Sequence, residues 1–132
     1  MITRLRVQNF RKHVDTEVVF TDSTVITGAN GIGKTSLIEA IYIALQGKSW
    51  RSGFSDILGR DQQDNSGGWW RIDVDFLDGE TRTVKYQDGQ KSFEVNGVVS
   101  GRLPIKLKKP VVLFEPNDLQ LLYGSPTRRR EF

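Results

Sequence analysis

Residues 25–36 read Val25-Ile-Thr-Gly-Ala-Asn-Gly-Ile-Gly-Lys-Thr-Ser36, which is the most informative motif of the chain. It contains the pattern Gly-x-x-x-x-Gly-Lys-Thr, with an extended run before it (Thr24 to Thr27) and a helical apolar pattern after it (Ser36 to Gln46), which Gly47 is expected to end. A strand, a loop and a helix in this order are the context that a phosphate-binding loop requires. The glycines let successive backbone N–H groups face one concavity, and the helix adds the positive end of its dipole. The sequence therefore predicts a site for a nucleoside triphosphate.

The residues of this loop have separate predicted roles in binding ATP and Mg²⁺. Backbone N–H groups from Asn30 to Lys34 are expected to surround the β-phosphate, while the Lys34 ammonium reaches the β- and γ-phosphate oxygens. The Thr35 hydroxyl is expected to bind Mg²⁺, and the Ser36 N–H to face the α-phosphate. The predicted cofactor contacts in the loop are Gly28, Asn30, Gly31, Ile32, Gly33, Lys34, Thr35 and Ser36.

Composition narrows the setting in which the protein works. The 132-residue chain has a formal charge of +3 and contains no cysteine, which excludes disulfides and thiolate metal sites and is typical of a reducing compartment. The N-terminal residues lack the apolar core of a signal peptide, and no apolar run reaches membrane-spanning length. We therefore expect a cytoplasmic protein with no membrane partner.

Lysine and arginine gather in clusters, which suit a phosphate-bearing partner such as DNA and equally suit a solvated surface. Three consecutive arginines on a helix point in three directions, so at most two of the last three basic residues can face DNA together. The candidate DNA contacts are Arg102, Lys106, Lys108, Lys109, Arg128, Arg129 and Arg130.

Alternating apolar residues predict two strands before the loop, Ile2 to Phe10 and Val14 to Phe20, with His13 as a turn residue between them. Farther along, Asp-Gly and Asn-Gly dipeptides predict tight hairpins. The elements expected there are a short helix at Phe54 to Leu58 and strands at Trp69 to Leu77, Thr81 to Gln87 and Lys91 to Val95.

Four further expectations concern single residues and short segments. Alternation places Trp69 and Trp70 on opposite faces of their strand. Glu39 is expected to be an exposed helix charge, because glutamate prefers surfaces. The polar stretch from Asp61 to Gly68 predicts a mobile loop, and Val111 to Phe114 predicts a buried strand after a β-rich insertion.

Several stretches occur together in the order and spacing of one family. They are Asn9-Phe10-Arg11, the loop with Leu37 to Tyr42 behind it, Gly47 to Arg51, and the run from Phe114 to Phe132. This arrangement resembles, along nearly the whole chain, the N-terminal part of the RecF family of bacterial DNA replication and repair proteins. The first two blocks are also shared by the wider group of structural-maintenance-of-chromosomes, double-strand-break-repair and ABC-type ATPases.

The resemblance implies an α/β P-loop NTPase fold, namely the N-terminal lobe of an ABC-type ATPase head with antiparallel strands and a hairpin-rich insertion. It further implies ATP-dependent DNA binding, an ATP-dependent homodimer, and recombination mediator proteins that help to load recombinase at single-stranded gaps during repair of DNA damage, including the SOS response. In related heads the Asn-Phe-Arg block lies beside the nucleotide, so the resemblance adds Arg11 as a phosphate or base contact. It would place Glu115 in a loop that senses magnesium or the γ-phosphate.

The residues do not contain the family's Leu-Ser-Gly-Gly signature or a strand that ends in Asp-Asp or Asp-Glu. Hydrolysis needs a positioned water, a base and a stabilised transition state. We therefore expect no catalytic residue and no appreciable ATP turnover in this segment alone, with slow ATPase activity in a full-length protein. The expected organisation is one truncated domain, with a phosphate-loop core at 1–48, an insertion at 49–103, and a return strand with the start of a helical arm at 104–132.

Two other interpretations stay open. A small P-loop kinase would use the same loop, although the N-terminal strands, the hairpins and the lack of an arginine-rich lid argue against it. A non-catalytic DNA-binding scaffold would depend on the basic residues instead. It predicts that DNA affinity falls steeply with salt and does not respond to nucleotide.

Overall fold

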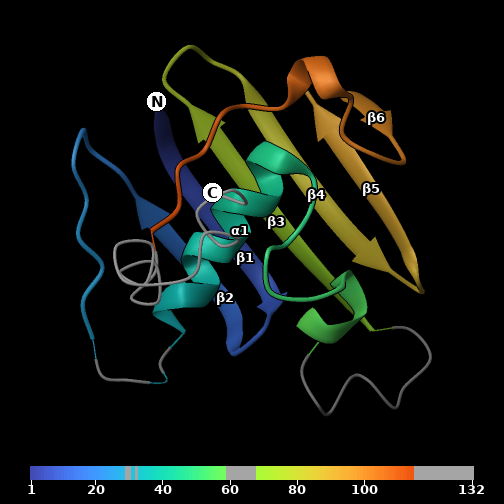
Figure 1. Cartoon of the computed structure of the whole chain (residues 1–132), viewed down its shortest axis with the longest axis horizontal. Coiled ribbons are helices and arrows are strands. Elements are labelled where there is room, and N and C mark those ends of the chain that lie inside the picture. The colour runs from blue at the N-terminus through green and yellow to red at the C-terminus, as the bar shows by residue number, and fades with distance from the viewer. Residues whose placement is uncertain (29–30, 32, 59–67, 115–132) are drawn as a thin grey trace, which may run out of the picture.

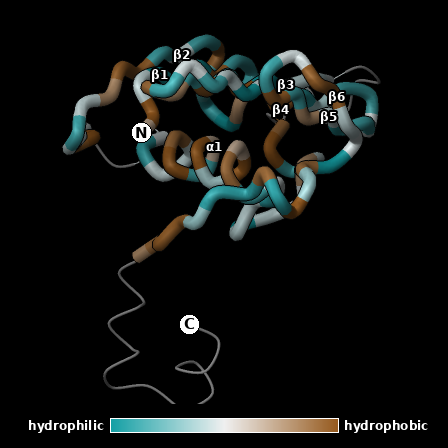
Figure 2. The backbone as a smooth tube through the Cα atoms, turned by 90° about the horizontal axis from the view of Figure 1, so that it is seen from above, coloured by the Kyte–Doolittle hydropathy of each residue, from teal (hydrophilic) through white to brown (hydrophobic). Residues whose placement is uncertain are grey.

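The computed structural model describes residues 1–28, 31, 33–58 and 68–114. An antiparallel sheet of six strands forms one layer, and helix α1 (Lys34–Gln46) packs across one face of it (Figures 1 and 2). Two 3-10 helices, η1 and η2, lie in the connections. The strands are β1 (Ile2–Phe10), β2 (His13–Val19), β3 (Trp69–Phe76), β4 (Thr81–Gln87), β5 (Gln90–Val95) and β6 (Val98–Ser100), and the 3-10 helices span Phe54–Ile57 and Ile105–Leu107. Among the described residues, no helix has the length and apolar character needed to cross a membrane.

The predicted hairpins are confirmed, and they continue the N-terminal strands in one sheet. The spatial order is β2-β1-β3-β4-β5-β6, so β3 pairs with β1 as well as with β4. At the turns, Asp88 and Asn96 have φ of 51° and 50° and are each followed by a glycine with positive φ. A tight two-residue hairpin turn needs positive φ at both of its central residues. The division of the chain into a core and an insertion stays a prediction.

Two predicted strands are wrong within the described residues. Neither the segment 24–27 nor the segment 111–114 forms a strand or pairs with one, although both have apolar β-branched side chains. Each segment packs only part of its side chains on the core: Ile26 and Val111 are half-buried, whereas Val25 and Phe114 have exposed fractions of 82% and 72%. A strand depends on a neighbouring strand to satisfy its backbone N–H and C=O groups, and apolar composition alone supplies none.

The core lies between the sheet and α1, and Trp70 is at its centre. The indole is fully buried, makes edge contacts with Phe10 and Phe54 at ring distances of 5.5 and 5.1 Å, and stacks on Tyr86 at 5.8 Å. Its Nε1 donates to the carbonyl of Phe54 at 3.0 Å, which ties η1 to β3. Because a buried indole N–H needs a partner, this bond also satisfies the ring's polar atom.

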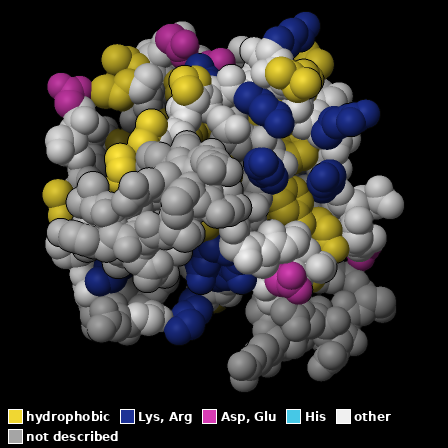
Figure 3. Space-filling view, in the orientation of Figure 1, with side chains coloured by type: hydrophobic (Ala, Val, Ile, Leu, Met, Phe, Trp, Pro, Cys, Tyr) yellow, Lys and Arg dark blue, Asp and Glu magenta, His cyan; other side chains and the backbone are white. Residues whose placement is uncertain are grey.

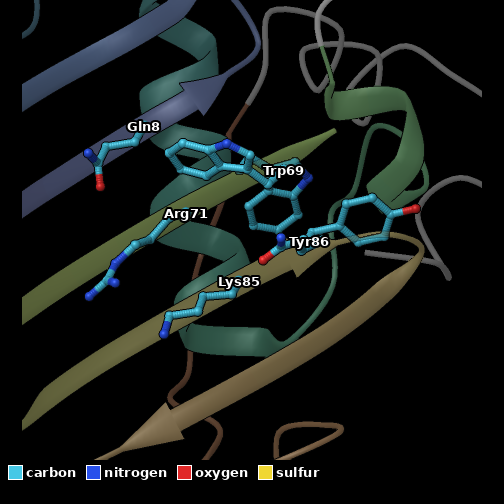
Figure 4. A pocket seen from close by; sticks show the side chains of 7 residues that line it. Gln8, Trp69, Arg71, Lys85 and Tyr86 are labelled. Atoms are coloured by element: carbon cyan, nitrogen blue, oxygen red, sulfur yellow. The ribbon is translucent and has the colours of Figure 1, made fainter. Parts of the chain in front are cut away.

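The opposite face of the sheet is polar. Trp69 lies there with an exposed fraction of 39%, which confirms that the two tryptophans point to opposite faces. Together with Gln8, Arg71 and Lys85 it lines a shallow pocket of about 260 Å³ (Figure 4). Next to the pocket, burial raises the pKa of Asp73, but hydrogen bonds from Arg71 and Thr83 outweigh burial and hold this pKa below its usual value.

The C-terminal end of α1 is fixed by three contacts. Gly47 has φ of 79° and donates its N–H to the Ile43 carbonyl at 2.8 Å, which confirms the predicted stop. The buried Arg82 donates to the Ala44 carbonyl at 2.9 Å, and the Lys109 N–H donates to the Leu45 carbonyl at 3.0 Å. The last carbonyls of a helix have no partner within it, so these donors satisfy them and orient α1 on the sheet.

Candidate nucleotide-binding site

The N-terminal end of α1 opens the candidate site. Helix α1 begins at Lys34, and Gly33 precedes it with φ of 95°, in the left-handed region. The first hydrogen bond of the helical pattern in α1 runs from the Leu37 N–H to the Gly33 carbonyl at 3.3 Å. The N–H groups of the three preceding residues therefore have no acceptor within the helix and point out of its positive end. This arrangement favours an anion at the start of α1.

A pocket of about 300 Å³ adjoins this helix end, and its charged lining is entirely cationic. Lys34 extends across the loop, and its Nζ donates to the Gly28 carbonyl at 2.6 Å. A cavity with several cations and no lining carboxylate suits a polyphosphate. The lining residues are Arg11, Lys12, Gly31, Gly33, Lys34, Thr35, Ser36 and Arg51, which include six of the predicted contacts, whereas Asn30 and Ile32 lie outside the described residues.

The turn between β1 and β2 holds the phosphate loop in place. Lys12 donates from Nζ to the Gly31 carbonyl at 2.8 Å, and His13 Nε2 lies 2.9 Å from the Gly33 carbonyl. Since a carbonyl only accepts, Nε2 donates to it, while Nδ1 lies 2.9 Å from the Thr16 hydroxyl. His13 begins β2 and positions the loop, a role that the sequence did not indicate.

The contact between His13 and Gly33 predicts that any side chain at residue 33 destabilises the fold. A Cβ at Gly33 would lie 2.5 Å from His13 Nε2, whereas a Cβ at Gly79, with a similar φ of 92°, would meet nothing within 4 Å. Gly79→Ala is expected to cost about 1–2 kcal/mol from the backbone alone. Gly33→Ala should cost at least about 1 kcal/mol more, because the His13 hydrogen bond is lost as well. Urea unfolding of both variants measures the difference, and equal losses would contradict the contact.

Glu39 is fully buried, so the prediction of an exposed helix charge is wrong. Arg11 donates to it twice, from Nε at 2.9 Å and from Nη2 at 2.8 Å. Ser49 Oγ donates to Oε1 at 2.6 Å and Arg51 Nη1 to Oε2 at 3.3 Å. A buried carboxylate persists where it is paired and its oxygens are hydrogen-bonded, and both conditions hold here. Glu39 thus joins α1 to the β1–β2 turn and to the segment after α1.

The remaining predicted contacts near the nucleotide have these positions. Arg11 lines the pocket, but its guanidinium faces Glu39, so its contact with nucleotide stays a prediction. The exposed Thr35 also lines the pocket, where its hydroxyl could complete Mg²⁺ coordination together with phosphate oxygens and water. Within the described residues, no group of three or more His, Cys, Asp or Glu side chains forms a metal site. Glu115 lies outside them.

Comparison with known proteins shows the family to which this chain belongs. The AAA ATPase domain family matches the chain over residues 1–116. This chain belongs to the AAA ATPase domain family. It is also 34% identical to the DNA replication and repair protein RecF of Desulforamulus reducens and 33% identical to that of Pelotomaculum thermopropionicum. The alignments cover 99% and 100% of this chain and 35% and 36% of those proteins, so the chain spans about a third of their length.

Two solved RecF structures are also similar to this chain. The chain superimposes on the recombination mediator protein RecF-ATP of the RecFOR pathway with a TM-score of 0.71 and 27% identity, covering 98% of this chain and 36% of that one. For RecF-ATPrS the TM-score is 0.74 with 28% identity, covering 99% and 36%. The resemblance to RecF and the predicted P-loop NTPase fold, as an N-terminal ABC-type lobe, are confirmed.

The AAA ATPase domain also carries an exposed basic surface. Arg102 and Lys91 line one open hollow of about 730 Å³, and Lys106 and Lys108 follow close by in the sequence. Figure 3 shows Lys and Arg side chains gathered on this face. These four residues form no ion pair within the described chain. Lys109 differs, because its Nζ lies 3.6 Å from Glu80 and 4.8 Å from the Phe76 ring centre. Residues 128–130 lie outside the described range.

Proposed function

We propose that this chain is the ATP-binding lobe of a RecF-like ATPase that acts on DNA during repair and recombination. The observation that carries the proposal is the cationic pocket at the N-terminal end of α1, where free helix N–H groups and Lys34 converge. Relatives named as DNA replication and repair proteins, and a neighbour named RecF-ATP, support it. The ligand is ATP with Mg²⁺, which Thr35 would help to coordinate.

In this proposal the residues of the loop bind and orient the triphosphate. The Lys34 ammonium exchanges the Gly28 carbonyl, 2.6 Å away, for phosphate oxygens, which are stronger acceptors because they are charged. Lys12 and His13 keep the loop carbonyls turned away from the phosphates by binding them. Hydrolysis also requires a base and groups that stabilise the transition state. We propose that other parts of a full-length protein, in an ATP-dependent homodimer, supply them.

Calorimetric titration with a slowly hydrolysed ATP analogue and Mg²⁺ tests the proposal. Lys34→Ala removes charge-assisted bonds to phosphate, so it is expected to weaken binding about 10–100-fold. Lys48→Ala is the matched control, because Lys48 is exposed, lies beyond the C-terminal end of α1 and does not line the pocket. Equal affinity of the wild type and the Lys34 variant would exclude the loop as the nucleotide site.

The proposal extends to DNA through the basic surface of Arg102, Lys106 and Lys108. Unpaired cations on one face favour the phosphate backbone of a nucleic acid. In the full-length protein, which we place in the cytoplasm with recombination mediator proteins as partners, ATP should change the affinity for DNA. A DNA-binding scaffold would instead show steep salt dependence with no nucleotide effect, so fluorescence anisotropy with and without ATP separates the two.

A further inference from the structure

We propose that the open hollow beside β6 binds an acidic segment of a partner protein, with an apolar side chain of that segment on Leu103 and Ile105 and its carboxylates on Lys91 and Arg102. The hollow lies between the start of β5 and the chain that joins β6 to η2, and its volume is about 730 Å³. Ligand sites commonly have volumes of about 300–1,000 Å³. The inference goes beyond the proposed function, because neither the phosphate loop nor ATP takes part in it.

Apolar side chains are exposed at this hollow. Ile105 lines it and is 86% exposed. Val98 shares one face of β6 with Ser100, another lining residue, and is 72% exposed. In Figure 3, apolar side chains lie among the Lys and Arg side chains of this face. Exposed apolar side chains that gather beside a hollow, with charged residues around them, are typical of a surface that binds another protein.

The charged residues of the hollow are both cations, and neither is neutralised. Lys91 and Arg102 line it and no carboxylate does, and neither cation forms an ion pair within the described chain. Lys91 Nζ lies 5.5 Å from the centre of the Phe54 ring, so an aromatic face and not an acid holds the ammonium. Cations without a counter-ion complement carboxylates on a partner, so the hollow favours an acidic ligand.

The wall of the hollow is ordered before any ligand binds. Ser100 Oγ donates to the Arg102 carbonyl at 2.8 Å, which fixes the turn that carries Arg102. In η2, the Leu107 N–H donates to the Pro104 carbonyl at 2.9 Å, and the Leu107 carbonyl accepts from the buried Arg82 at 2.5 Å. The second bond ties η2 to the sheet. A wall that is already fixed adds little ordering cost to binding.

The apolar contacts favour a peptide over DNA as the occupant. Interfaces with DNA are more polar than interfaces between proteins, and a phosphate backbone would leave Ile105 uncovered. The centre of an interface between proteins is apolar and its rim is polar, which is how Ile105 and the two cations combine here. Lys106 and Lys108 do not line the hollow, so they stay available to DNA while a peptide occupies it.

Fluorescence anisotropy of the full chain with a labelled peptide of the repeat Asp-Asp-Leu tests the inference. Saturable binding is expected, and Arg102→Glu should weaken it at least about tenfold, because a carboxylate would then face carboxylates. Ile105→Ser should also weaken it about tenfold, because the apolar contact is lost. A peptide with asparagine in place of aspartate should not bind. Both variants should keep the wild-type urea midpoint, because both side chains are exposed.

Two exposed residues away from the hollow provide matched controls. Lys85→Glu reverses an exposed cation on the opposite face of the sheet. Val14→Ser removes an exposed apolar side chain from β2, the strand at the other edge of the sheet. Neither substitution should change the affinity for the peptide.

Four results would overturn the inference. The first is a wild-type chain that does not bind the acidic peptide, and the second is wild-type affinity in Arg102→Glu or Ile105→Ser. A single-stranded oligonucleotide that displaces the peptide and is weakened by Arg102→Glu but not by Ile105→Ser would assign the hollow to nucleic acid. A concentration-dependent dimer in sedimentation that Ile105→Ser abolishes would assign it to a second copy of this chain. None of these results bears on the ATP analogue, so this inference and the proposed function fail separately.

Discussion

Replacing Glu39 with alanine is expected to destabilise the protein by about 3–5 kcal/mol, the cost of breaking a buried ion pair by removing one partner. The carboxylate is fully buried and accepts from Arg11, Ser49 and Arg51. Its removal leaves the Arg11 guanidinium largely buried without a counter-ion and disconnects the β1–β2 turn from α1. Urea unfolding measures the loss.

Glu17 provides the control for this experiment. It pairs with Arg4 at 3.0 Å on the outer face of the sheet, but its side chain is 49% exposed. Solvent screens exposed ion pairs, so Glu17→Ala should be nearly neutral. Similar losses for both variants would contradict the view that Glu39 joins three segments of the fold.

Replacing Trp70 with alanine is expected to cost about 3–5 kcal/mol, because a fully buried aromatic leaves a cavity that the neighbours fill only in part. The indole contacts three aromatic rings and donates to the Phe54 carbonyl at 3.0 Å. Its loss should therefore also loosen η1 from β3. Urea unfolding, with tryptophan-independent detection by far-ultraviolet circular dichroism, measures the change.

The neighbouring tryptophan is a matched control in the same strand. Trp69 points to the opposite face and is 39% exposed, so Trp69→Ala should cost about 1 kcal/mol or less. The assignment of faces would be wrong if Trp69→Ala were the more destabilising of the two substitutions.

The features that sequence could predict are those encoded by neighbouring residues. The phosphate loop, the stop of α1 at Gly47, and the turns at Asp88 and Asn96 depend on glycine spacing and on local backbone preferences. The opposite faces of Trp69 and Trp70 follow from the period of a strand. The helix stop, the turns and the two faces are confirmed, because each requires only a few consecutive residues, whereas the role of the loop in binding phosphate stays a prediction.

What could not be predicted depends on partners that are distant in the sequence. Glu39 has the surface pattern of an ordinary helix charge, and only the fold brings Arg11 to it from 28 positions away. The bonds from His13 to Gly33 and from Arg82 to the end of α1 have no sequence signature. The segments 24–27 and 111–114 failed for the related reason that strand formation depends on a partner strand.

In the proposed function, the pocket at the start of α1 binds the phosphates of ATP. A crystal structure of the protein with a slowly hydrolysed ATP analogue and Mg²⁺ would show whether it does. We predict phosphate oxygens within hydrogen-bonding distance of the first N–H groups of α1, Lys34 Nζ moved from the Gly28 carbonyl to the phosphates, and Mg²⁺ at the Thr35 hydroxyl. A nucleotide bound elsewhere on the molecule, with the contact between Lys34 and Gly28 intact, would contradict the account.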